Sequence, residues 1–232
     1  MGSELRNDGG RVGVTRLIAE RPLRHGRPGF GVLFAAVLML MLVSGCADDG
    51  QSQGPPPAGD ARTLYPVTVA DFEAFVRETG YVTDAERYGW SVVQLDVVNY
   101  TVVDGANWRI PDGVNPPQRT DLPVTQVSYQ DAQAYADWAG ATLPTYLEYW
   151  SAVATDTRRI IENGGGPISP VDSVNVVGNV WDITQPDGAG NVRLAGGSLF
   201  CAADTCHGTS QDRELYVDIE TGNIHIGFSV FR

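Results

Sequence analysis

The sequence predicts an α+β domain over residues 63–232, with about three helices, a few short strands and much irregular backbone. Three segments carry the start signal of a helix followed by an apolar stripe. The segments between and after them are rich in Gly, Pro, Asn and Asp and contain only short strand-like pieces. Neither an internal repeat nor the regular strand–helix alternation of a parallel sheet is present. These observations favour an irregular architecture that carries its function on loops.

Helices are predicted over 68–80, 128–140 and 145–159. In each segment a Ser or Thr is followed three positions later by an acid, and the pair can satisfy the free backbone N–H groups of the first turn. Apolar residues then recur at three- and four-residue spacing, which indicates one buried face. Gly80 and Gly140 are expected to end the first two helices. The capping pairs are Thr68 with Asp71, Ser128 with Asp131, and Thr145 with Glu148.

Strands are predicted within 90–98, 191–200 and 223–231, where β-branched and aromatic residues gather between turn residues. The second of these runs into "GGSLFCAADTC" (196–206), which holds both cysteines of the predicted domain, Cys201 and Cys206. A cysteine segment that begins with two glycines suits a site on a loop held by a rigid frame.

The first 62 residues are predicted to be targeting sequence and linker. Residues 1–28 are rich in arginine, and the apolar run "FGVLFAAVLMLMLV" (30–43) is too short to span a bilayer as a helix, so together they indicate an export signal. The run ends in "LVSGC", which resembles a bacterial lipobox and predicts removal of 1–45 and lipidation of Cys46. The alternative is an ordinary signal peptide with a chance cysteine. Residues 46–62 are polar and rich in Gly and Pro, which predicts a disordered tether. We therefore expect an exported protein, anchored by lipid to a bacterial membrane at the cell surface or the periplasmic face.

The charge balance excludes nucleic acid as a partner. The chain has 16 basic residues, all of them arginine, against 28 acids, and its formal net charge is −12. Such a surface repels phosphate backbones and anionic lipid headgroups, and no basic stripe offsets the repulsion. Solubility is a sufficient explanation for the acidity, so the charge alone assigns no function.

Six motifs occur in the order in which one family carries them. They are "TGYVTDAERYGWSVV", "GANWRIPDG", "LPVTQVSYQDAQAYADWAGATLPTYLEYW", "GNVWDIT", "LAGGSLFCAADTC" and "GNIHIGF". Together they resemble the sulfatase-modifying factor family, and specifically its formylglycine-generating enzymes, over most of 65–228. The resemblance implies an irregular fold distantly like that of C-type lectins. It also implies a reaction, the oxidation of a cysteine in a Cys-x-Pro-x-Arg motif to formylglycine with O₂ and Cu(I), and a partner, an exported sulfatase-like protein or peptide.

By position, the resemblance makes Cys201 and Cys206 the catalytic pair and the copper ligands. Soft thiolates select Cu(I), whereas two thiolates are too few for a closed structural zinc site. A three-histidine iron site, as in the related sulfoxide synthases, is excluded because only His207 and His225 follow the signal.

The export compartment also allows a Cys201–Cys206 disulfide. The alternative function is then a non-catalytic, membrane-anchored lipoprotein that keeps the scaffold for binding or assembly. A weaker alternative is calcium-linked binding of glycan or peptide through the lectin-like frame.

The resemblance further implies a copper and oxygen pocket lined by Trp181 and Ser198, although a Trp in an apolar strand also suits a plain core position. A calcium loop is implied in "NVVGNVWD", where Asp182 stands in place of the family's usual glutamate. The implied calcium ligands are Asn175, Gly178, Val180 and Asp182. His207 is expected to be an exposed loop residue. The family's opening strands, its first calcium site and its basic-aromatic run after the cysteines have no counterpart in the sequence.

Overall fold

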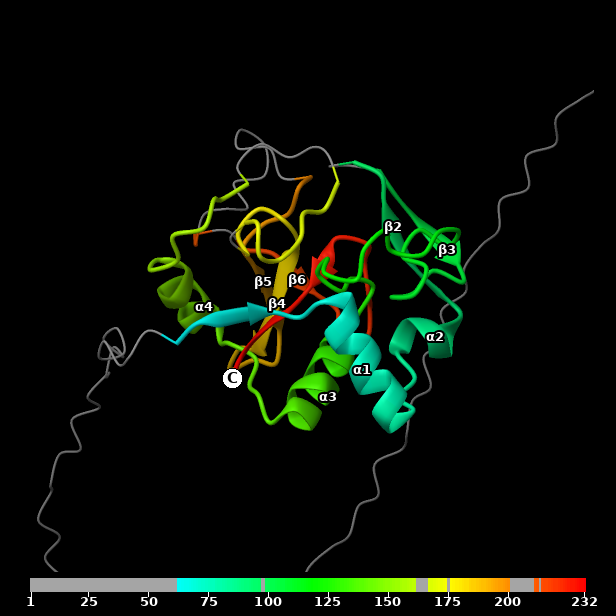
Figure 1. The fold of residues 1–232 in the computed structure, drawn as a ribbon, viewed down its shortest axis with the longest axis horizontal. Coiled ribbons are helices and arrows are strands. Elements are labelled where there is room, and N and C mark those ends of the chain that lie inside the picture. Colours follow the sequence, from blue (N-terminus) through cyan, green and yellow to red (C-terminus); the bar gives the residue numbers. More distant parts are fainter. Residues whose placement is uncertain (1–61, 97–98, 162–166, 175, 201–210, 213) are drawn as a thin grey trace, which may run out of the picture. The chain divides into compact units, whose positions relative to one another are not determined.

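The computed structural model describes residues 62–96, 99–161, 167–174, 176–200, 211–212 and 214–232 (Figure 1). The predicted signal peptide, the lipidated Cys46 and the tether up to residue 61 lie outside these residues, as do Asn175, Cys201, Cys206 and His207. Within the described part of the chain, no helix is both long enough and apolar enough to cross a membrane.

Four helices are present in the described residues, one more than predicted. They are α1 (Val69–Thr79), α2 (Asp84–Tyr88), α3 (Tyr129–Ala139) and α4 (Tyr146–Val153). The three predicted capping pairs are confirmed, because in each one the hydroxyl and the carboxylate both accept a backbone N–H of the other residue. Gly80 and Gly140 end α1 and α3 with left-handed φ angles of 69° and 61°, as predicted. Helix α4 ends at Val153, well before residue 159.

Helix α2 begins with the same device as the predicted helices. The Thr83 hydroxyl accepts the Glu86 N–H at 3.3 Å, and the Glu86 carboxylate accepts the Thr83 N–H at 3.0 Å. Gly89 ends the helix with a φ of 75°. Because α2 has only 5 residues, it has no room for an apolar stripe, and periodicity therefore gives no sign of it.

The strands are short and form three small sheets. They are β1 (Leu64–Pro66), β2 (Trp90–Gln94), β3 (Tyr100–Asp104), β4 (Trp181–Pro186), β5 (Val192–Ala195), β6 (Tyr216–Val217), β7 (Ile226–Gly227) and β8 (Ser229–Phe231). The largest sheet has the order β6-β5-β4-β7, with β4 and β7 parallel and the other pairs antiparallel. Strands β2 and β3 form a hairpin, and β1 pairs with β8. The predicted irregular α+β class is confirmed.

The helices lie on two sides of the four-stranded sheet (Figure 1). Helix α4 packs against β5, whereas α1 and α3 pack against each other and α3 reaches β4. Phe72 of α1 is at the centre of the larger hydrophobic core, with its ring 5.3 Å from that of Trp108 and 6.0 Å from that of Tyr135. Aromatic side chains bury much apolar surface per residue, so this cluster anchors α1 and α3 together. Trp108 of the "GANWR" motif is therefore a core residue.

A buried glutamine connects the hairpin to the segment before β7. Gln126 has a left-handed φ of 60°, which is uncommon for a residue other than glycine. Its backbone N–H donates to Asn223 O at 3.0 Å. Its side-chain amide donates to Pro111 O at 2.6 Å and to Val92 O at 3.1 Å, and its carbonyl oxygen accepts the Ser91 hydroxyl at 2.5 Å. These bonds fix the backbone from which His225 projects.

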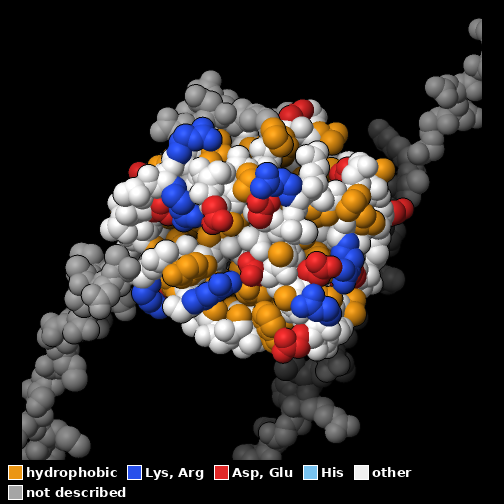
Figure 2. All heavy atoms as spheres, in the orientation of Figure 1, with side chains coloured by type: hydrophobic (Ala, Val, Ile, Leu, Met, Phe, Trp, Pro, Cys, Tyr) orange, Lys and Arg blue, Asp and Glu red, His pale blue; other side chains and the backbone are white. Residues whose placement is uncertain are grey.

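Opposite charges are mixed on the surface. In Figure 2, arginines and acids lie beside one another and between apolar side chains. Arg119 pairs with Asp121, and Arg158 pairs with Asp156 at 2.6 Å. The face shown therefore carries no extended field of a single sign.

Candidate active site

The chain turns sharply between β5 and the predicted cysteine pair. Gly196 and Gly197 adopt φ angles of 82° and 72°, which L side chains rarely adopt. At Gly196 a Cβ atom would lie 2.1 Å from the Tyr149 hydroxyl oxygen, so a side chain would not fit there. The glycine pair therefore directs the chain into the interior, where Ser198 is buried.

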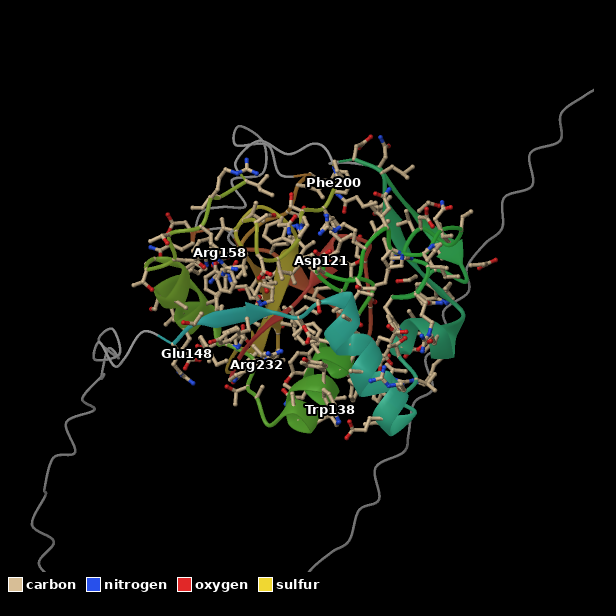
Figure 3. The ribbon with its side chains drawn as sticks, viewed as in Figure 1. Asp121, Trp138, Glu148, Arg158, Phe200 and Arg232 are labelled. Carbon is tan, nitrogen blue, oxygen red and sulfur yellow. The ribbon has the colours of Figure 1, made fainter. Side chains whose placement is uncertain are left out.

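Three side chains meet just before Cys201. Ser198 Oγ lies 2.7 Å from His225 Nδ1, and both residues are buried. The Phe200 N–H donates to Ser198 Oγ at 3.3 Å, and the Phe200 ring lies 5.0 Å from the His225 ring in an edge-on arrangement. Figure 3 shows Phe200 at the opposite end of the domain from Trp138 of α3. The described residues next to the predicted copper pair are thus fixed by hydrogen bonds and ring contacts.

Trp181 reaches the same place through its backbone. Its N–H donates to His225 O at 2.9 Å, and its register partner in β7 is Ile226. Its side chain belongs to the hydrophobic core cluster. The structure therefore joins Ser198 to His225 through side chains and Trp181 to His225 through the backbone, and the Trp181 indole occupies a core position.

His225 was not among the predicted site residues. Burial lowers the pKa of its imidazole to about 4, so the ring is neutral at physiological pH. Its contact with Ser198 joins residues 27 positions apart, and no local motif contains both. A polar residue inside the apolar segment 223–231 was the only available signal.

Asn179 ties the site to a neighbouring loop. Its backbone oxygen accepts the Leu199 N–H at 3.1 Å, while its side-chain amide exchanges two hydrogen bonds of 2.9 Å with the backbone of Ser169. The loop that contains Ser169 forms one wall of a cavity of about 700 Å³. The other walls include Trp108, Ile224 and a run of prolines, Pro111, Pro116, Pro117 and Pro123.

The described part of the predicted calcium loop centres on Asp182. This side chain is buried, and its oxygens accept the Ser229 hydroxyl at 2.5 Å and the Tyr149 hydroxyl at 3.5 Å. Burial raises the pKa of the Asp182 carboxyl group to about 7. Calcium takes about six to eight oxygen ligands. The described donors, Asp182 with the carbonyl groups of Gly178 and Val180, are too few on their own, and Asn175 lies outside the described residues.

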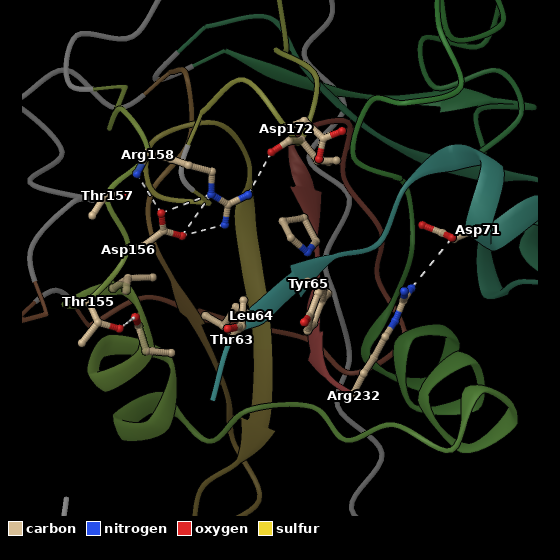
Figure 4. Close-up of a pocket in the computed structure, with 14 residues that line it drawn as sticks. Thr63, Leu64, Tyr65, Asp71, Thr155, Asp156, Thr157, Arg158, Asp172 and Arg232 are labelled. Atoms are coloured by element: carbon tan, nitrogen blue, oxygen red, sulfur yellow. Dashed lines mark hydrogen bonds and ion pairs between the residues drawn. The ribbon is translucent and has the colours of Figure 1, made fainter. Parts of the chain in front are cut away.

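A second cavity, of about 480 Å³, lies between β1 and the end of α4 (Figure 4). Two ion pairs lie along it. Arg158 contacts Asp156 and also donates to Val171 O at 3.0 Å, and Arg232 lies 3.8 Å from Asp71. Asp172 also lines the cavity. The two ion pairs close this seam of the fold. Across the described residues, no group of three His, Cys, Asp or Glu side chains is placed to hold a metal ion.

Comparison with known proteins agrees with the motif order. Residues 62–166 match the sulfatase-modifying factor enzyme 1-like domain. The chain is 37% identical over 139 residues to the formylglycine-generating enzyme of Thermomonospora curvata, which covers 53% of this chain and 45% of that protein. It is 29% identical over 233 residues to the formylglycine-generating enzyme of Bos taurus, with 68% of this chain and 62% of that protein covered. The chain thus spans roughly half to under two thirds of these two relatives.

A third relative is matched over a larger share of its length. The inactive Cα-formylglycine-generating enzyme 2 of Mus musculus is 31% identical over 219 residues, with 68% of this chain and 71% of that protein covered. The matched domain, the extent of this similarity and the fold agree. The chain therefore belongs to the sulfatase-modifying factor family, the family of the formylglycine-generating enzymes.

Proposed function

We propose that the protein is a copper-dependent oxidase that converts a cysteine of a substrate protein to formylglycine with O₂, and that Cys201 and Cys206 hold the Cu(I). One observation carries the proposal. Ser198, which precedes Cys201 by three positions in the sequence, lies with its Oγ 2.7 Å from His225 Nδ1, and the Trp181 N–H donates to the His225 backbone oxygen. A pair of thiolates binds Cu(I) in preference to zinc or iron, because soft thiolate ligands select Cu(I).

The described residues support such a site in two ways. Ser198 and Trp181 are buried, at 1% and 3% exposed, so they give water little access from the protein side. His225 is neutral, and it brings no positive charge that would oppose a bound monovalent cation. When bound, Cu(I) supplies the reactivity towards O₂ that amino-acid side chains lack.

The proposed substrate is an exported sulfatase-like protein or peptide with a Cys-x-Pro-x-Arg motif. The acidity of the chain, with a net charge of −12, suits a motif that carries an arginine four positions after its cysteine. The proposed location is a bacterial membrane, where lipid on Cys46 holds the enzyme on the exported side. This location fits a substrate that is itself exported.

The decisive experiment follows product and metal separately. The reduced protein is loaded with Cu(I) and incubated in air with a peptide that contains Cys-x-Pro-x-Arg, and a hydrazide probe traps the aldehyde for mass spectrometry. We expect one Cu(I) per chain and a trapped aldehyde at the cysteine position. Cys206→Ala is expected to lose both the metal and the product, whereas Ser151→Ala on the exposed side of α4 retains them. A copper-loaded protein that leaves the peptide unchanged contradicts the proposal.

A non-catalytic function is favoured by one specific observation. The relative matched over the largest share of its length among the three described above is named as inactive. In that case the chain is a membrane-anchored binding or assembly lipoprotein with a Cys201–Cys206 disulfide. The mass of the native protein distinguishes the two functions. A mass lower by two hydrogens that survives mild reductant supports the disulfide form, and a free thiol pair supports the oxidase.

Calcium in the 175–182 loop is a further part of the proposal. A ligand that binds only the native state stabilises it. We therefore expect Ca²⁺ to raise the midpoint of thermal unfolding of chelator-treated protein, and Asp182→Asn to abolish the rise. Asp121→Asn, at a partly exposed ion pair, is the matched control and keeps the rise. An unchanged midpoint in the unmodified protein would show that the loop folds without the ion.

A further inference from the structure

The backbone around His225 is held by hydrogen bonds on both sides. Its backbone oxygen accepts the Trp181 N–H at 2.9 Å. The neighbouring Ile224 N–H donates to Val92 O at 3.2 Å, and the Ile226 N–H donates to Asn223 O at 3.1 Å. Strands β4 and β2 and a local turn therefore fix the backbone on both sides of His225. The direction of the imidazole is set by the fold.

The Ser198 hydroxyl can form only a few hydrogen bonds. A serine hydroxyl offers one hydrogen and two lone pairs. The Phe200 N–H uses one lone pair at 3.3 Å. The hydrogen and the second lone pair then remain for His225 Nδ1, at 2.7 Å, and for a ligand of the proposed oxygen pocket.

The tautomer of the neutral imidazole determines whether the Ser198 hydroxyl donates its hydrogen to His225 or accepts one from it. With the proton on Nε2, Nδ1 accepts the Ser198 hydrogen; with the proton on Nδ1, the ring donates and the Ser198 hydrogen is free for a ligand. The described groups that face the ring are the Ser198 hydroxyl and the edge of Phe200. Neither is charged, so no partner among them favours the imidazolium form.

We infer that His225 is a positioning residue that sets the direction of the Ser198 hydroxyl hydrogen in the oxygen pocket. This inference rests on the proposed function, because it assigns to Ser198 and His225 a joint task in that reaction. The structural alternative is a core histidine whose hydrogen bond contributes only to stability. The positioning role and the structural role predict different effects of a conservative replacement of His225 on the O₂-dependent activity.

Two replacements of His225 separate these roles. The Asn side chain places an amide near the position of Nδ1 and can keep the bond to Ser198, whereas Leu keeps the bulk and removes the bond. We expect His225→Leu to bind Cu(I) with unchanged stoichiometry but to lose about tenfold in kcat/KM for O₂, the scale of one lost hydrogen bond. His225→Asn is expected to recover most of that loss. Thr184→Val is the matched control, because it removes a fully buried hydroxyl that donates to Arg193 O at 2.7 Å and does not contact His225, and it should leave the O₂ dependence unchanged.

A double-mutant cycle tests whether the two residues act together. Ser198→Ala should show the same loss as His225→Leu, and the double variant should be no worse than either single variant. Losses that multiply in the double variant would overturn the inference, as would an unchanged O₂ dependence in His225→Leu.

A second measurement needs neither copper nor turnover. In copper-free protein labelled with ¹⁵N-histidine, the ring shifts of His225 report its tautomer, and Ser198→Ala should change them while Thr184→Val does not. Unchanged shifts in Ser198→Ala would overturn the inference. If the shifts change but the unmodified protein yields no aldehyde, the hydrogen bond is real and the proposed function fails, and the assigned task fails with it.

Discussion

Buried polar side chains in this protein are held mainly by hydroxyl and backbone groups and only rarely by opposite charges. His225 contacts Ser198, and Asp182 contacts Ser229 and Tyr149. Burial therefore shifts each pKa towards the neutral form, to about 4 for His225 and about 7 for Asp182. Burial therefore favours the neutral forms of the His225 imidazole and the Asp182 carboxyl group. The direction of each hydrogen bond then depends on which atom carries the proton.

Acid should destabilise the protein through His225. The pKa of its imidazole is lowered in the folded state from 6.5 to about 4, so the unfolded chain binds a proton first. The free energy of unfolding therefore has its full His225 contribution above pH 6.5. This contribution is lost as the pH falls towards 4, by roughly 3 kcal/mol at about 1.4 kcal/mol per pKa unit. Urea unfolding at a series of pH values measures this loss, and His225→Asn should show a shallower acid limb. If the free energy of unfolding depends on pH in the same way in both proteins, His225 does not cause the acid destabilisation.

At this scale the sequence singled out Ser198 and Trp181 from the motif resemblance, and their pocket role stays a prediction. The structure adds His225, which contacts the Ser198 side chain and the Trp181 backbone. His225 was considered only as one of too few histidines for an iron site. Its task depends on the packing of β7 beside β4, which no pattern local to residue 225 reveals.

At the scale of elements, local hydrogen-bond chemistry predicted the helices better than the strands. Every helix in the described part begins with a hydroxyl–acid pair, and three of these starts were predicted from sequence. Strands β6 and β7 have 2 residues each and β1 has 3, too few to show alternation. The predicted strand segment 223–231 divides into β7 and β8, which belong to different sheets. Such assignments are set by long-range pairing.

Removal of the α2 cap should cost a measurable amount of stability. Thr83 is buried, and its hydroxyl accepts the Glu86 N–H. We expect Thr83→Ala to lower the free energy of unfolding by about 1 kcal/mol, whereas Thr83→Ser keeps the cap and most of the stability. Chemical denaturation of the three proteins provides the comparison. Equal losses in the Ala and Ser variants would instead assign the cost to the missing methyl group.

At the scale of the molecule, the domain combines the family fold with an aromatic core and a buried polar turn. The chain spans less than two thirds of the first two relatives described above, and its domain is built around the aromatic core at Phe72 and the polar turn at Ser198. The core follows from apolar and aromatic residues that the sequence shows directly. The polar turn depends on the glycine pair and on the contact between distant strands, so only its general position was predictable.

The predicted lipid anchor concerns the whole chain and is tested in cells. The lipobox resemblance predicts that Cys46 carries lipid after processing. When the full chain is expressed in a bacterium, it should enter the detergent phase on phase partitioning, and Cys46→Ser should remain in the aqueous phase. Gly50→Ala, in the predicted tether, is the control and should partition like the unmodified chain. Equal partitioning of the Ser variant would exclude lipid at this cysteine.

The pairing of β1 with β8 has a consequence for the order of folding. Leu64 lies opposite Phe231, so the strand made first among the described residues finds its only described sheet partner in the strand made last. During synthesis this strand must wait until nearly all of the domain has been produced, and the sheet closes only afterwards. Late closure of this sheet suits the export that the sequence predicts, because a secretion channel for unfolded chains requires a chain that has not yet folded.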